Sequence, residues 1–183
     1  MIIGITGFYA SGKDAVADYL TTKGFKKFVY SDYLRAELKR EGKSITRDNL
    51  ISKGNEIRKK YGAGELSRRI LEDIKKENLR DAVVVGLRNS EEVTEMRKAP
   101  RFTLWFVDAP ADLRYRRSQH RMSLKDKVSY EEFLKQENQE SSNDPHAQQL
   151  QKVAKMADMV IKNDKDLEHL YEQVEKILQL ARN

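Results

Sequence analysis

Short apolar runs alternate with segments of helical periodicity along most of this chain. The runs are rich in β-branched residues and end at glycine, proline or polar positions, which is typical of buried strands. Strands that are apolar throughout and alternate with helices imply a parallel sheet covered by helices on both faces. The pattern therefore predicts a single α/β domain over residues 1–183 with a five-stranded parallel sheet. The predicted strands are residues 2–6, 28–30, 82–86, 102–109 and 159–162.

The segments between the strands place apolar residues on one side at helical spacing. Thr46 is a helix-start signal, and Ser129 with Glu132 has the spacing of a capping box. Residues 117–145 are basic, polar and weakly apolar, and we predict that they form a mobile lid. The predicted helices are residues 13–22, 33–41, 46–60, 65–76, 90–98, 112–121, 131–140 and 167–178.

Composition excludes several kinds of chemistry. The chain has no cysteine, and its three histidines, His120, His146 and His169, are far apart in the sequence. Disulfides, cysteine nucleophiles and thiolate metal sites are excluded, and a zinc site is not expected. The sequence starts on its first strand without a basic leader, and nowhere do about 18 apolar residues run together. We expect a soluble cytoplasmic protein without a membrane partner.

The net charge of +6 suits an anionic partner. A small phosphorylated molecule and a nucleic acid both meet that requirement. The 35 basic and 29 acidic residues are interleaved, which is also typical of a solvated helical surface. No aromatic platform for stacking bases is evident, so nucleic acid is the less favoured partner. The sequence leaves open whether the protein is a monomer or a homodimer.

The sequence GFYASGKDAV, residues 7–16, follows the first strand and opens the first helix. Gly7 and Gly12 let the backbone curl so that its N–H groups converge on phosphate oxygens at the positive end of the helix. Lys13 then reaches the β- and γ-phosphates. This context predicts a site for ATP or GTP.

Asp14 stands where such loops carry a serine or threonine that ligates Mg²⁺. A carboxylate also suits Mg²⁺, either directly or through a water, because this ion prefers hard oxygens. The alternative is that Asp14 only favours the helix N-terminus electrostatically. A carboxylate beside a triphosphate is repelled unless a cation lies between them, so we predict a metal-linked role for Asp14.

With this loop the chain resembles the P-loop kinases of the nucleoside-monophosphate kinase and dephospho-CoA kinase group, over nearly its whole length. GKD is similar to the phosphate loop of phage deoxynucleoside-monophosphate kinases and of animal-type phosphomevalonate kinases. ADMVIKN at 157–163 is similar to the segment that ends dephospho-CoA kinases and their archaeal relatives. The resemblance implies nucleotide contacts at Gly7, Ala10, Ser11, Gly12, Lys13, Asp14, Ala15 and Asn163.

Two further segments resemble the acceptor site of these kinases, for which residues 33–80 would form a helical region. SDYLRAEL at 31–38 is similar to their G-D-x-L-R segment, which implies that Asp32 and Arg35 lie at the acceptor. VVVGLRN at 83–89 carries acceptor-phosphate binding to Arg88, but Val85 replaces the expected aspartate. Asp14 is expected to compensate for that loss.

RYRRSQHR at 114–121 resembles the lid entry of these kinases. The resemblance implies that Arg117 and Arg121 close on the transferring phosphates, where they stabilise charge on the phosphoryl oxygens. We expect Arg114 and Arg116 to lie instead on the solvated face of this helix.

The acceptor decides which catalytic groups are needed. A phosphate acceptor is already anionic and needs arginines, whereas an alcohol needs a base, for which Asp32 is the candidate. The D-x-L-R pattern and Arg88 favour an ATP- or GTP-dependent kinase for a nucleoside or deoxynucleoside monophosphate. The alternatives are a dephospho-CoA or phosphomevalonate-type kinase, and a nucleotide-binding regulatory or nucleic-acid-binding protein without kinase activity.

Overall fold

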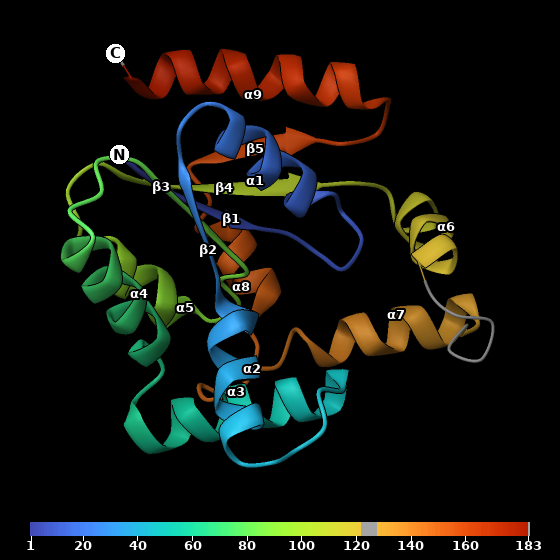
Figure 1. The fold of residues 1–183 in the computed structure, drawn as a ribbon. Coiled ribbons are helices and arrows are strands. Elements are labelled where there is room, and N and C mark those ends of the chain that lie inside the picture. Colours follow the sequence, from blue (N-terminus) through green and yellow to red (C-terminus); the bar gives the residue numbers. More distant parts are fainter. Residues whose placement is uncertain (122–127, 183) are drawn as a thin grey trace.

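A five-stranded, wholly parallel sheet forms the centre of the molecule, as predicted (Figure 1). The computed structural model describes residues 1–121 and 128–182. The strand order is β2-β3-β1-β4-β5, so the first strand lies in the middle of the sheet. The strands are β1 (Ile2–Thr6), β2 (Lys26–Val29), β3 (Ala82–Val85), β4 (Phe102–Asp108) and β5 (Met159–Lys162).

Helices cover both faces of this sheet. Successive residues of a strand point to opposite faces, and the buried side chains accordingly separate into two clusters. Helices α1 and α9 cover one face, and α4, α5 and α8 cover the other (Figure 1). The helices are α1 (Lys13–Thr22), α2 (Tyr30–Arg40), α3 (Arg47–Tyr61), α4 (Glu65–Lys76), α5 (Ser90–Met96), α6 (Ala111–Arg121), α7 (Tyr130–Gln139), α8 (Leu150–Lys155) and α9 (Leu167–Arg182).

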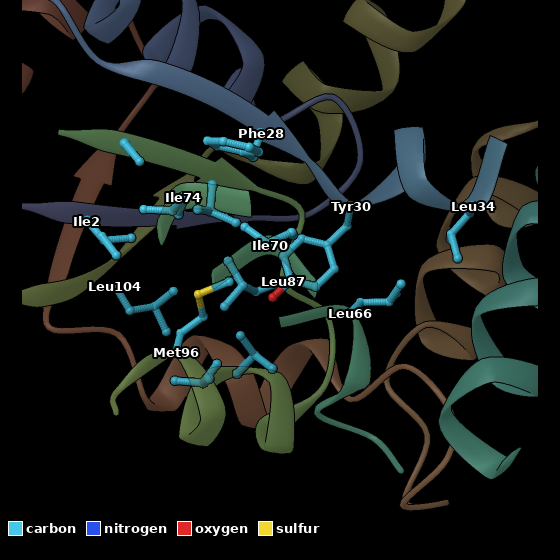
Figure 2. Packing of buried hydrophobic residues seen from close by; sticks show 14 of the residues in the cluster. Ile2, Phe28, Tyr30, Leu34, Leu66, Ile70, Ile74, Leu87, Met96 and Leu104 are labelled. Carbon is cyan, nitrogen blue, oxygen red and sulfur yellow. The ribbon is translucent and has the colours of Figure 1, made fainter. Parts of the chain in front are cut away.

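The α4 and α5 side of the sheet holds the larger apolar cluster. Ile70 of α4, Met96 of α5 and Leu104 of β4 are fully buried in it (Figure 2). Leu34 of α2 and Leu66 of α4 extend the same cluster beyond the sheet. Helices α2, α4 and α5 are thereby fixed to the core.

The second strand is Lys26–Val29 rather than residues 28–30. Its register pairs Lys26 with Ala82 and Val29 with Val85. Because β2 is an edge strand, polar lysines are tolerated in it, and an apolar pattern therefore placed its start too late. Tyr30 already begins α2 and is buried.

Helix α8 was not predicted from the sequence. It has six residues and buries Leu150 and Val153 against the rest of the protein. So short and polar a segment gives almost no periodic signal, since only tertiary contacts stabilise it. Thr46 and Ser129 cap α3 and α7 as predicted.

Part of the predicted lid, residues 122–127, lies outside the described residues. The chain beyond α7 is held to the body, because the Asn89 side chain donates to the carbonyl oxygens of Pro145 and Ala147, each at 2.8 Å. Among the helices of the described part, none is both long and apolar enough to cross a membrane.

Candidate nucleotide and acceptor site

The loop between β1 and α1 has the curled backbone that its glycines predict. Gly12 has φ of 96° and Ala10 has φ of 60°. A Cβ atom on Gly7 would lie 2.5 Å from the Val107 carbonyl oxygen, and one on Gly12 would lie 2.1 Å from Asn163 Nδ2. Both glycines are therefore required by close packing as well as by their φ angles.

The same loop leaves polar groups for a ligand at the start of α1. The first intrahelical bond runs from the Val16 amide to the Gly12 carbonyl oxygen, so the amides of residues 13–15 precede the hydrogen-bonded ladder. The Ser11 hydroxyl is buried and finds no hydrogen-bond partner among the described residues. Amides at a helix N-terminus attract phosphate oxygens, which fits a nucleotide phosphate.

Asn163, just after β5, is hydrogen-bonded to the phosphate loop. Its Nδ2 donates to the Ser11 carbonyl oxygen at 2.8 Å, and its own amide donates to the Asp108 carbonyl oxygen at 2.7 Å. Arg117 of α6 donates to the carbonyl and side-chain oxygens of Asn163, both at 3.2 Å. Asn163 is buried, and its hydrogen bonds link the phosphate loop to α6.

A cleft of about 720 Å³ opens beside the phosphate loop. Six cationic and three acidic side chains line it, which favours an anionic ligand. The cleft brings together predicted site residues from three parts of the chain. They are Lys13, Asp14, Asp32, Arg35 and Arg88.

Asp32 and Arg35 lie in the first turns of α2. Arg35 Nη1 is 2.6 Å from Asp32 Oδ1 and donates to Ser31 Oγ at 2.7 Å. Both charged side chains are well exposed to solvent. The predicted acceptor arginine therefore forms an ion pair with the predicted base in this structure.

Arg88 follows β3 and is partnered by an acid from a distant part of the chain. Its Nη1 is 2.5 Å from Glu140 Oε2 and donates to Gln148 Oε1 at 3.1 Å. Val85, in the place of the expected aspartate, is buried in β3 and lines the cleft. This part of the cleft wall is apolar, with the arginine directly beyond it.

Arg47, the first residue of α3, is a cleft residue that the sequence did not reveal. Its guanidinium donates to Glu140 Oε1 at 2.7 Å and to Gln136 Oε1 at 2.8 Å. The guanidinium carbon lies 4.9 Å from the ring centre of Tyr9 in the phosphate loop. No local motif marks this arginine, because its partners are about ninety positions away along the chain.

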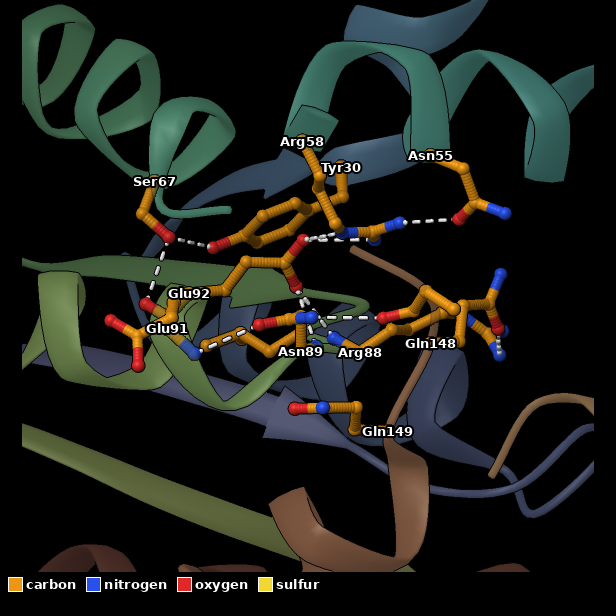
Figure 3. Close-up of polar contacts among 12 residues, drawn as sticks. Tyr30, Asn55, Arg58, Ser67, Arg88, Asn89, Glu91, Glu92, Gln148 and Gln149 are labelled. Carbon is orange, nitrogen blue, oxygen red and sulfur yellow. Dashed lines mark hydrogen bonds and ion pairs between the residues drawn. The ribbon is translucent and has the colours of Figure 1, made fainter. Parts of the chain in front are cut away.

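A buried polar network adjoins the cleft and contributes Arg58 and Tyr30 to its lining (Figure 3). Glu92 Oε1 accepts from Arg58 Nε at 3.0 Å, and both side chains are almost fully buried. The Ser67 hydroxyl donates to the Glu92 carbonyl oxygen and lies 2.6 Å from the Tyr30 hydroxyl. Burial raises the pKa of Tyr30 well above its ordinary value, so its hydroxyl stays protonated. This network fixes α3, α4 and α5 relative to α2.

The prediction that Arg114 lies on a solvated helix face is wrong. Arg114 is buried, its Nε donates to the Ala109 carbonyl oxygen at 2.9 Å, and its guanidinium pairs with Glu137. The guanidinium also lies over the Phe8 ring. Contacts between α6, α7 and the phosphate loop bury this side of α6, whereas Arg116 is exposed, as predicted.

An acidic residue at the carboxyl edge of the sheet lies outside the cleft lining. Asp108 lies at the carboxyl end of β4 but lines a separate cavity of about 420 Å³ beside α6. The side chain of Arg121 lies outside the described residues. Arg117 is hydrogen-bonded to Asn163, which in turn bonds the phosphate loop.

No family model matches the chain. A UPF0200 protein from Sulfurisphaera tokodaii is 32% identical over 177 residues, which cover 97% of this chain and 95% of that relative. The chain belongs to the UPF0200 family. A UPF0200/UPF0201 protein from Archaeoglobus fulgidus is 29% identical over the whole of this chain, which spans 56% of that longer relative.

Solved structures similar to this UPF0200 chain share its fold. Shikimate kinase from Bacteroides thetaiotaomicron has a TM-score of 0.62 and 14% identity, with 100% of this chain and 99% of that chain covered. Dephospho-CoA kinase from Campylobacter jejuni has a TM-score of 0.52 and 19% identity, with 98% and 96% covered. These similarities confirm the predicted P-loop fold.

The UPF0200 cleft offers carboxylates to a metal ion. Across residues 1–121 and 128–182, no group of three or more histidine, aspartate or glutamate side chains is placed to hold a metal ion. Asp14 and Asp32 both line the cleft. Mg²⁺ is commonly held by one or two carboxylates together with substrate phosphates, and these residues fit that kind of site.

Asn163→Ala is expected to weaken ADP binding by about tenfold, because removing a buried hydrogen-bond partner costs about 1–3 kcal/mol. Titration calorimetry with ADP measures the effect. Gln173→Ala is the matched control, since Gln173 bonds the backbone of Lys162 in the same connection without a bond to the phosphate loop. Equal ADP affinity in the two variants would show that Asn163 does not shape the loop.

Proposed function

We propose that this UPF0200 protein is a kinase that transfers the γ-phosphoryl group of ATP or GTP to a small phosphorylated acceptor. A nucleoside or deoxynucleoside monophosphate is the acceptor that we favour. The observation that carries the proposal is the position of the phosphate loop. Lys13 and Asp14 of that loop share one cleft with Arg35 and Arg88, so donor and acceptor groups face the same space.

The donor side would use the loop amides and Lys13. These groups hold the β- and γ-phosphates at the N-terminus of α1. Mg²⁺, when bound, neutralises charge on the phosphate oxygens, and Asp14 is the residue proposed to hold it. In the transfer, the bond from the γ-phosphorus to the bridging oxygen breaks and a bond to the acceptor oxygen forms.

The acceptor side is cationic, which supports a phosphorylated acceptor. Arg47 and Arg88 share one carboxylate, Glu140. These three side chains form a corner of the cleft, and this corner keeps a net positive charge. A phosphate acceptor needs positioning and charge neutralisation but no base. A nucleoside monophosphate meets these requirements with its phosphate, and a cleft of about 720 Å³ has room for a nucleoside.

A phosphorylated alcohol, such as dephospho-CoA or a phosphomevalonate-type substrate, is the second candidate. The observation that favours it is the place of Asp32, whose carboxylate lines the same cleft as Lys13. An alcohol acceptor needs a base within hydrogen-bond reach. Asp32 would act as this base once the Arg35 side chain moved from Asp32 to the substrate phosphate.

A screen of phosphoryl acceptors tests the proposal. ADP or GDP release is measured with ATP or GTP, Mg²⁺ and each nucleoside monophosphate, dephospho-CoA and phosphomevalonate. Turnover with a monophosphate supports the favoured acceptor, and turnover with an alcohol supports the second candidate. Nucleotide binding without turnover on any acceptor would contradict the kinase proposal and favour a regulatory nucleotide-binding protein.

Asp14→Ala is expected to raise the Mg²⁺ concentration needed for half-maximal turnover by about tenfold, and Asp14→Ser to restore part of the loss. The physical reason is the loss of a hard oxygen ligand next to the phosphates. Mg²⁺ titrations at saturating nucleotide measure this. Asp18→Ala, one turn further along α1 and bonded to Lys27, is the control. An unchanged Mg²⁺ requirement in Asp14→Ala would reduce Asp14 to a charge at the helix end.

A further inference from the structure

Two arginines from different elements converge on one carboxylate inside the cleft. Arg47 comes from the first turn of α3 and Arg88 from the loop after β3. They approach the two different oxygens of Glu140, at 2.7 Å and 2.5 Å. Arginines that grip a carboxylate in this way have the geometry that also suits a phosphate group. All three residues line the cleft.

This corner lies next to the phosphate loop. The Arg47 guanidinium stacks over the Tyr9 ring at 4.9 Å, and Tyr9 is part of the loop. The cleft that Arg47 shares with Lys13 is continuous. A group bound by Arg47 and Arg88 therefore lies on the acceptor side of the transferring phosphoryl group.

The charge of the corner is not balanced. Burial alone would raise the pKa of Glu140, but Arg88 and Arg47 hold this pKa below its ordinary value. Glu140 is therefore an anion at neutral pH, and with two guanidinium groups the corner carries a net charge of about +1. A phosphate monoester carries a charge of about −2 at this pH, so it would neutralise the arginines more completely than the carboxylate does.

We propose that Arg47 and Arg88 form the subsite for the acceptor's phosphate, and that Glu140 fills this subsite as an internal anion which the acceptor displaces. This inference rests on the proposed kinase function and names two residues, Arg47 and Glu140, that the sequence did not. Binding then needs only a side-chain exchange, because the backbone of Glu140 stays anchored through its carbonyl oxygen to the Leu150 amide.

Glu140 would thereby act on specificity. Its competition lowers the apparent affinity of every anion by the fraction of molecules in which the carboxylate has left the arginines. A dianionic phosphate outcompetes the carboxylate more readily than a monoanion does, since its Coulomb attraction to the two guanidinium groups is larger. A purely structural ion triad would show no such competition.

Inorganic phosphate is the probe, measured by titration calorimetry in the absence of nucleotide. Glu140→Gln keeps the size of the side chain but removes the competing charge, and is expected to bind phosphate at least about tenfold more tightly than the unsubstituted protein. Glu37→Gln is the matched control, because Glu37 also pairs with two arginines, Arg40 and Arg69, but lies away from the cleft lining.

Arg47→Ala is the second variant and is expected to weaken phosphate binding by about tenfold. The phosphate loop is the same in all these proteins, so the differences belong to the corner. Phosphate affinity in Glu140→Gln that equals or falls below that of Glu37→Gln would overturn the proposal. If Glu140→Gln does not fold, unchanged phosphate affinity in Arg47→Ala would overturn it by itself.

These measurements contain no donor nucleotide and no turnover. Failure of the acceptor screen together with the expected phosphate affinities would remove the kinase function and leave the anion exchange standing. The expected turnover with no change of phosphate affinity in Glu140→Gln would support the kinase function and overturn the proposed displacement of Glu140.

Discussion

Lys13→Ala is expected to reduce phosphoryl transfer by at least about a hundredfold while leaving the fold intact. Lys13 begins α1 at the phosphate loop and lines the cleft. A cation placed on the transferring group stabilises charge that develops in the transition state, and removing one such group typically costs about 10²–10³ in rate. The measurement is NDP release with the acceptor that the screen identifies, together with thermal melting.

Lys23→Ala is the matched control, because Lys23 lies at the other end of the same helix and pairs with Glu175. It removes a lysine from α1 without touching the phosphate loop, so turnover should stay near that of the unsubstituted protein. Substantial turnover in Lys13→Ala would remove the phosphate loop from the mechanism.

Glu92→Gln is expected to lower the free energy of unfolding by about 3–5 kcal/mol, because breaking a buried ion pair leaves an uncompensated charge. Glu92 is fully buried and pairs with Arg58. Its Oε2 also accepts the backbone amides of Arg88 and Asn89 at 2.7 and 3.0 Å. A glutamine cannot accept on both sides, so the cap of α5 and the position of Arg88 are both weakened.

Glu91→Gln, at the neighbouring position of α5, is the control. Glu91 is exposed, so its substitution should change the unfolding free energy little. Urea unfolding of both variants measures the difference. Equal free energies of unfolding in the two variants would mean that the Glu92 and Arg58 pair does not stabilise the fold.

The parts of the molecule that depend on local patterns were predictable from the sequence. Each buried strand of the sheet is an apolar run, and the phosphate loop combines glycine spacing with a strand before it and a helix after it. The cap residues Thr46 and Ser129 also act within three positions. The edge strand β2 was misplaced by two residues at its start, because one of its sides is not buried.

The parts that depend on distant partners were not predictable. Arg47 and Glu140 lie 93 positions apart, and Arg114 pairs with Glu137 on another helix. A basic residue on a helix looks the same in the sequence whether it faces solvent or a buried acid, so Arg114 was assigned wrongly. Helix α8 has too few residues for a period to show.

The contact between Asn163 and Ser11 joins positions 152 residues apart. The phosphate loop is therefore translated well before Asn163. Contacts this distant in sequence form late, because a long segment must be ordered before they are made. A growing chain on the ribosome would thus carry the glycine loop long before the loop is held in shape. Nucleotide binding should appear only after Asn163 has been synthesised and has bonded to Ser11.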